Sequence, residues 1–260
     1  MVATSLLTSL SGSRARESRR ETQRAIAKRG GRGRGHSKES FEATINSIAT
    51  AWDMWDGFAG PSHVALLHHL VAQAQPERTE RGRTTALRGL ELLTQVEAHA
   101  QAMWAEVEIQ EAVLLAVAPG GRGGLRAARR GRQALCVLSN FSAAPGVRER
   151  MCLCDRTRQL LLRHAAAVPA PPAEPEHSGG AHALMTDQVT EGRTLALRTL
   201  ANLAAEEANR KAMWADTPTR AALLGAAAAS QPASIRDEAR RALANLSADP
   251  FVRQSMGLAN

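Results

Sequence analysis

The sequence predicts an all-α protein built from stacked helical repeats, and three observations support this fold class. Ala and Leu dominate a hydrophobic content of 44%, while the chain has only four Phe, four Trp and no Tyr. Sheets favour aromatic and β-branched residues, so this composition favours closely packed helices. In addition, one segment of the sequence recurs further along the chain, and asparagines mark additional copies of it.

The first segment, residues 1–40, is strongly basic and carries most of the formal net charge of +8. Such a composition cannot repay the entropy of ordering, so we predict a disordered basic tail. Two alternatives stay open. The absence of acidic residues before Glu17 is typical of an organellar transit peptide, and the Arg/Gly-rich stretch 29–35 resembles an RNA-binding segment.

The remaining residues, 41–260, form the predicted repeat domain. Its strongest internal match is free of gaps: the segment from Arg83 to Ala105 recurs from Arg193 to Ala215. Further copies share a pattern of Ala, an apolar residue, two variable residues, Leu, a variable residue, Asn and an apolar residue. The marker residues are Asn140, Asn202 and Asn245, with Leu92 in the corresponding place of an earlier copy and Thr50, after Ile45 and Ile48, in a weak first copy.

Most intervals between these markers fit the roughly 40 to 47 residues of a helical repeat. The interval between Asn140 and Asn202 is longer. It contains a Pro-, Gly- and Ala-rich stretch, 168–182, which we predict to be an insertion that cannot continue a helix. A smaller Gly-rich loop is predicted at 119–124.

Each copy also contains a Met, followed in three copies by Trp, and then a pair of leucines. Helical periodicity therefore predicts three helices per unit: a short one at the Met, a second through the Leu pair, and a third that ends at the Asn. We predict that the Met-Trp pairs are core residues. These pairs are Met54-Trp55, Met103-Trp104 and Met213-Trp214.

The Ala-Leu-x-x-Leu-x-Asn-Leu pattern, together with Asn209-Arg210, resembles the armadillo repeat. This resemblance implies a right-handed α-solenoid of about four to five repeats over residues 41–260, with the third helices lining a concave groove. It also implies that Asn140, Asn202 and Asn245 clamp the main chain of an extended partner. The alternative is that each Asn caps the end of its own helix.

One helical turn before the marker position lie Arg88, Cys136, Arg198 and Arg241. Importin-alpha-type members of the family have Trp there, so this chain departs from that pattern. Residues four apart share a helix face, and guanidinium groups pair well with carboxylates. We therefore predict that Arg88, Arg198 and Arg241 bind an acidic partner segment. The alternative is that they are ordinary solvated helix residues.

Several function classes lack support in the sequence. There is no Gly-rich phosphate loop and no Gly-x-Ser-x-Gly nucleophile motif, and Cys152, Cys154 and His164 do not have the spacing of a zinc site. We therefore predict no enzyme, no catalytic residue, no cofactor, no metal and no small-molecule substrate. The odd number of cysteines favours a reducing, intracellular compartment, either cytoplasm or nucleus, unless the tail is a transit peptide.

No apolar run is long enough to cross a membrane, so no membrane partner is predicted. The function that the sequence favours is a protein-protein interaction scaffold or adaptor, which binds an extended and acidic partner segment in the groove. The alternative is a nucleic-acid-associated protein that contacts phosphates through residues 1–40.

Overall fold

The computed structural model describes residues 69–75, 79–117, 124–167 and 179–258. The chain divides into two units, Met1–His69 and Leu70–Asn260, and the labelled helices belong to the second. The predicted tail at 1–40, the weak first copy and the first Met-Trp pair lie outside the described residues.

All regular secondary structure in the described residues is helical, which confirms the all-α prediction. A helical stretch at 69–74 precedes the labelled elements. These are α4 (Glu80–Leu93), α5 (Glu97–Ala105), α6 (Val107–Val117), α7 (Gly124–Ala143), α8 (Pro145–Leu153), α9 (Asp155–Ala165), α10 (Gly179–Ala205), α11 (Glu207–Ala215), α12 (Thr217–Ala226), α13 (Ala233–Ser247) and α14 (Pro250–Ser255).

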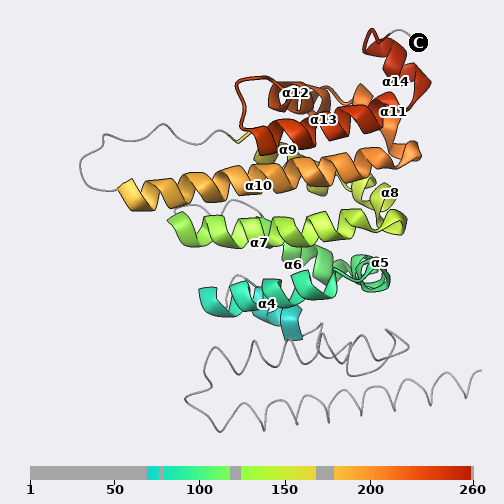
Figure 1. The fold of residues 1–260 in the computed structure, drawn as a ribbon. Helices are drawn as coiled ribbons and strands as arrows, with labels where there is room; N and C mark the ends of the chain where they lie inside the picture. Colours follow the sequence, from blue (N-terminus) through green and yellow to red (C-terminus); the bar gives the residue numbers. More distant parts are fainter. Residues whose placement is uncertain (1–68, 76–78, 118–123, 168–178, 259–260) are drawn as a thin grey trace, which may run out of the picture. The chain divides into compact units, whose positions relative to one another are not determined.

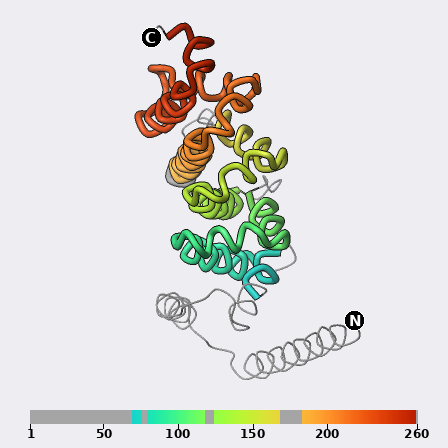
Figure 2. The backbone as a smooth tube through the Cα atoms, turned by 90° about the vertical axis from the view of Figure 1, so that its right-hand side faces the viewer, coloured from blue at the N-terminus to red at the C-terminus, as the bar shows by residue number. Residues whose placement is uncertain are grey.

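Each helix packs against the helix three places further along the chain, so the described helices form rows (Figure 1). One row contains α4, α7, α10 and α13, a second α5, α8, α11 and α14, and a third α6, α9 and α12. Three consecutive helices, such as α5, α6 and α7, form one layer, and Figure 2 shows the succession of layers from the side. The predicted landmarks fall where expected: Met103 lies in α5, the Leu114-Leu115 pair in α6 and Asn140 near the end of α7.

A single residue in the extended conformation connects the first helix of each layer to the second. Glu106, Cys154 and Asp216 separate α5 from α6, α8 from α9 and α11 from α12, and their ψ angles are 110°, 102° and 104°. One residue outside the α region is enough to end a helix and redirect the chain. Asp216 also caps α12 by accepting a hydrogen bond from the Thr219 amide at 3.0 Å.

The core between the rows is aliphatic, as the composition predicts. The third helices α4, α7 and α10 bury Leu side chains at recurring positions; these are Leu87, Leu90, Leu135, Leu138, Leu197 and Leu200. The described Met-Trp pairs are buried as predicted, and the Trp104 ring meets the Phe141 ring edge-on at 5.2 Å. In two of the Leu pairs only the first leucine is buried: Leu114 and Leu223 are buried, whereas Leu115 and Leu224 are exposed.

The predicted insertion at 168–182 ends earlier than expected. α10 begins at Gly179, so 179–182 belong to its first turn, while 168–178 lie outside the described residues. The helix-favouring run that starts at Ala181 explains the earlier start, because Ala, Leu and Met have high helix propensity and outweigh the two preceding glycines.

Candidate functional site

The row of α4, α7, α10 and α13 brings the predicted partner-binding residues to one surface. We call this the third-helix surface: the exposed and half-exposed side chains of these four helices. Arg88, Arg198 and Arg241 are exposed, and Asn140, Asn202 and Asn245 are half-buried. Arg241 lies beside Asn202 of the preceding layer. Repeated layers therefore align equivalent positions in space.

The asparagine amides connect one layer to the layer before it. Asn140 Nδ2 donates to the Glu91 carbonyl at 3.1 Å and to Thr94 Oγ1 at 3.2 Å. Asn245 Nδ2 donates to the Ala201 carbonyl at 2.8 Å. The alternative that each Asn caps its own helix is therefore wrong, because each amide reaches the preceding third helix instead.

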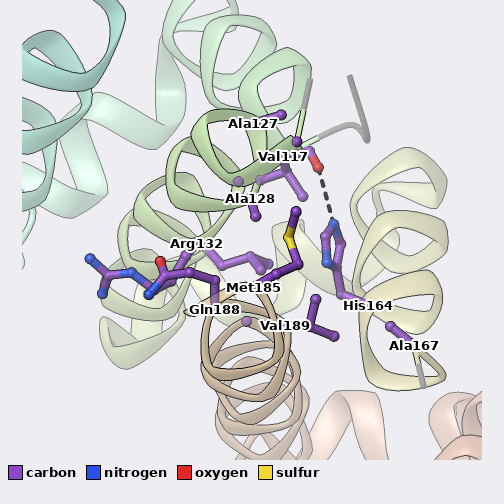
Figure 3. A pocket seen from close by; sticks show the side chains of 13 residues that line it. Val117, Ala127, Ala128, Arg132, His164, Ala167, Met185, Gln188 and Val189 are labelled. Atoms are coloured by element: carbon purple, nitrogen blue, oxygen red, sulfur yellow. Dashed lines mark hydrogen bonds between the residues drawn. The ribbon is translucent and has the colours of Figure 1, made fainter. Parts of the chain in front are cut away.

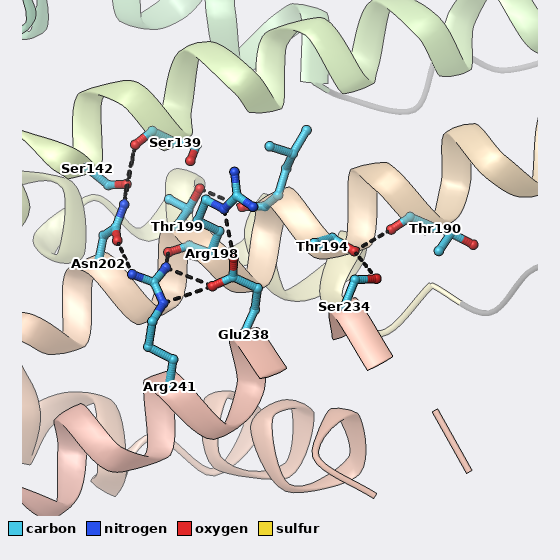
Figure 4. Close-up of polar contacts among 11 residues, drawn as sticks. Ser139, Ser142, Thr190, Thr194, Arg198, Thr199, Asn202, Ser234, Glu238 and Arg241 are labelled. Atoms are coloured by element: carbon cyan, nitrogen blue, oxygen red, sulfur yellow. Dashed lines mark hydrogen bonds and ion pairs between the residues drawn. The ribbon is translucent and has the colours of Figure 1, made fainter. Parts of the chain in front are cut away.

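Asn202 makes the same type of contact and one more. Its Nδ2 donates to Ser142 Oγ at 3.0 Å and lies 3.5 Å from the Ser139 carbonyl, while its Oδ1 accepts from Arg241 Nη1 at 3.1 Å (Figure 4). The acceptor carbonyls of Glu91, Ser139 and Ala201 occupy equivalent places in successive helices. The recurring Asn is thus an inter-layer hydrogen-bond donor.

The two C-terminal arginines share one carboxylate. Arg198 Nε donates to Glu238 Oε1 at 2.8 Å, and Arg241 Nη2 pairs with Glu238 Oε2 at 2.8 Å (Figure 4). Arg241 Nη2 also donates to the Arg198 carbonyl at 3.3 Å. Glu238 carries a single negative charge against two guanidinium groups, so it offsets part of their positive charge. Sequence reasoning missed this acid because Glu238 stands outside the Arg and Asn positions.

A related network lies between α4 and α7. Arg88 Nη1 pairs with Glu91 Oε2 at 2.7 Å, and Gln133 Nε2 donates to the same oxygen. Gln133 occupies the place in α7 that Glu238 occupies in α13. Here the acid comes from the same helix as the arginine, and the neighbouring layer contributes an uncharged amide.

A recurring arginine closes the ends of the third helices, and sequence analysis missed its role. Arg148 donates to the carbonyls of Ser142 and Ala143, and Arg210 to those of Ala204 and Ala205. Arg253 donates to the Ser247 carbonyl at 3.0 Å. A cation at a helix C-terminus satisfies orphan carbonyls and complements the helix dipole. The Asn209-Arg210 pair of the sequence pattern therefore has a structural role.

A cavity of about 290 Å³ lies between α6, α7, α9 and α10 (Figure 3). Most of its lining is apolar. His164 Nε2 donates to the Val117 carbonyl at 3.0 Å, and burial lowers the pKa of His164, so the imidazole is kept neutral more readily than in water. Among the described lining residues there is no carboxylate and no hydroxyl or thiol nucleophile.

The cysteines and the described acidic residues form no recognisable chemical centre. Burial raises the pKa of the Cys152 and Cys136 thiols, which disfavours the reactive thiolate. Within the described ranges, no group of three or more His, Cys, Asp or Glu side chains is placed to hold a metal. Nor does any helix in that part of the chain have the length and apolar character needed to span a membrane.

Comparison with known proteins gives little guidance. No protein-family model matches the chain, and neither does any curated protein sequence. The crystal structure of an engineered protein from the Northeast Structural Genomics Consortium is similar over 70% of this chain and 79% of its own, with 18% sequence identity and a TM-score of 0.32. That score is too low for any conclusion about fold or function.

Proposed function

We propose that the chain is a right-handed armadillo-type α-solenoid that binds an extended segment of a partner protein along its third-helix surface. The observation that carries this proposal is the alignment of α4, α7, α10 and α13, which places Arg88, Arg198 and Arg241 at equivalent positions. The resemblance of the repeats to armadillo units supports the finer description of the fold.

The arginines keep hydrogen-bonding capacity for a partner. Arg198 uses only its Nε for Glu238, and Arg88 uses only Nη1 for Glu91, among their contacts with described residues. Their side chains are 48% and 55% exposed. The guanidinium groups can therefore donate to carbonyl or carboxylate oxygens of a bound segment without breaking the internal ion pairs.

The spacing of the layers fits an extended chain. Neighbouring packed helices are about 8–10 Å apart, and an extended chain advances about 3.3 Å per residue. Each layer would therefore meet every third residue or so of the bound segment. Because the asparagine donors are used between layers, we expect Asn140 and Asn245 to contribute their Oδ1 atoms, which accept no hydrogen bond from a described residue.

An array of extended 15-residue peptides, varied in net charge, would test the proposal on the full-length chain. The informative variant is Arg88→Ser with Arg198→Ser. The matched control is Arg156→Ser with Arg163→Ser, which also removes two exposed arginines. Both lie in α9, and Arg156 pairs across layers with Glu111 of α6. We expect the double variant to lose peptide binding and the control to retain it.

Either of two results would contradict the proposal. If the full-length chain bound no peptide of any charge class, the third-helix surface would not be a peptide site. If both the double variant and the control bound as well as the unchanged chain, the binding site would lie on another surface.

A further inference from the structure

The two halves of the third-helix surface differ in charge at equivalent positions. Arg81 of α4 and Arg129 of α7 occupy the place that Glu191 has in α10 and Ser234 in α13. About one helical turn further along, Arg132 of α7 occupies the position that Asp237 has in α13. In total, α4 and α7 carry seven arginines against two glutamates, whereas α10 and α13 carry five arginines against four acidic residues.

The basic residues of the α4–α7 half are available to a partner. Arg81 and Arg129 are exposed, and neither side chain makes an ion pair or hydrogen bond with a described residue. They lie about two helical turns before Arg88 and Cys136, so each shares a helix face with the residue already assigned to the surface. Arg81 and Arg129 hold equivalent positions in α4 and α7, and these two helices pack against each other.

The α10–α13 half offers less positive charge. Arg198 and Arg241 share Glu238, and Glu191 is exposed at the position that Arg81 and Arg129 occupy in the first half. An ion pair of 3.3 Å between Arg132 and Glu191 marks the junction of the halves. A carboxylate of a partner beside α10 would meet repulsion from Glu191, whereas the equivalent positions of α4 and α7 carry Arg81 and Arg129.

We propose that the acidic residues of the bound segment are held by Arg81 and Arg129, on the α4–α7 half, and not by Arg198 and Arg241. This inference rests on the proposed function and deepens it: the partner is an acidic extended protein segment, and its carboxylates are concentrated at one end of the site. Charge complementarity thereby fixes the register of the bound chain along the row.

Charge reversal tests the inference with the full-length chain. The probe is a fluorescein-labelled 15-residue peptide rich in Asp and Glu, and the readout is its anisotropy at two salt concentrations. The test variant is Arg81→Glu with Arg129→Glu. The matched control is Lys211→Glu with Arg163→Glu, which makes the same change in net charge at exposed sites in α11 and α9, outside the third-helix surface. Both variants retain the basic residues 1–40.

The test positions tolerate glutamate. Arg81 lies in the first turn of α4 and Arg129 in the second turn of α7, where a negative side chain interacts favourably with the helix dipole or is close to neutral. Circular dichroism would verify that the helices persist. We expect the test variant to weaken peptide binding about tenfold and the control less than twofold, since each reversal replaces a favourable ion pair with repulsion.

Three outcomes would overturn the inference. Equal weakening by the test and control variants would show that net charge, not position, attracts the peptide. Stronger weakening by Arg198→Ser than by the Arg81 and Arg129 reversal would place the acids on the other half. Tighter binding of a single-stranded RNA of uniform sequence, lost in the test variant, would identify a phosphate site. In the first two cases the proposed function would still hold if binding in the peptide array depended on Arg88 and Arg198.

Discussion

The α4–α7 and α10–α13 pairs use one backbone arrangement to present different net charge, because the first pair carries seven arginines against two acids and the second five arginines against four acids. Asn140 and Asn245 make the same inter-layer hydrogen bond in both pairs, to the carbonyls of Glu91 and Ala201. Beside them, Gln133 fills the position that Glu238 has in the second pair. Both side chains contact a charged residue of the preceding helix, Glu91 or Arg198. A repeat can therefore change the charge of its surface while it keeps the contact between layers.

The layers also differ in how they cover their tryptophans. Trp104 is 2% exposed and packs against Phe141, whereas Trp214 is 9% exposed and its ring has the Arg220 guanidinium over it at 5.5 Å. The first Trp belongs to an apolar core and the second borders a surface pocket that also includes Phe251. We therefore expect the Trp of the Met-Trp pair to contribute more to the free energy of unfolding at position 104 than at position 214.

The largest effect is expected from truncating the tryptophans. Trp104→Ala should lower the free energy of unfolding by about 3–5 kcal/mol, because Trp104 is almost fully buried and its truncation would leave a cavity in the core. Trp214→Ala should cost less, since solvent and Arg220 can partly fill the space. Urea unfolding followed by circular dichroism would compare the two. Equal losses would contradict the distinction between the layers.

The next largest effect is expected at the asparagines. Asn202→Ala removes a donor to Ser142 and an acceptor for Arg241, and should cost about 1–3 kcal/mol. Asn245→Ala, with one acceptor, should cost less. Gln95→Ala is the control, because this exposed amide has no side-chain hydrogen bond to a described residue. Losses no larger than that of the control would show that the inter-layer bonds do not stabilise the fold.

A smaller effect on stability is expected from neutralising Glu238. Glu238→Gln breaks two half-exposed ion pairs and should change the free energy of unfolding by about 1 kcal/mol or less. The same variant should bind the acidic peptide more tightly, because Arg198 and Arg241 lose their shared counter-charge. Glu207→Gln in α11 is the control for net charge. If both variants bound the acidic peptide equally more tightly, the effect would come from net charge and not from the position of Glu238 beside the two arginines.

The smallest effect is expected from the pH response of His164. Burial lowers its pKa in the folded state below the ordinary value of 6.5, so the unfolded chain binds the proton more readily. The contribution of His164 to stability should be fully present above pH 6.5 and should be lost as the pH falls toward the folded-state pKa. Urea unfolding of the unchanged chain and of His164→Gln between pH 5 and 8 would isolate this contribution. A parallel pH dependence in both would assign it to other groups.

The sequence by itself determined the helical class and the positions of the helices within each unit. The positions of the Met, the Leu pair and the Asn follow helical periodicity, which depends only on residues that are close in the sequence. It also indicated that Arg88, Arg198 and Arg241 hold equivalent positions of the third helices, because repeated layers align such positions, but it did not single out Arg81 or Arg129. It did not determine the start of α10, since two glycines precede the helix-favouring run there.

Only the tertiary structure decided what these surface residues contact. The asparagine amides reach across to the preceding helix, Glu238 joins two arginines from different layers, and Arg210 caps a helix that ends before its own begins. Each contact joins residues brought together by a turn or by stacking of layers, which pattern along one helix does not encode. The charge of a single residue can be read from the sequence, whereas its counter-charge depends on which helix packs beside it.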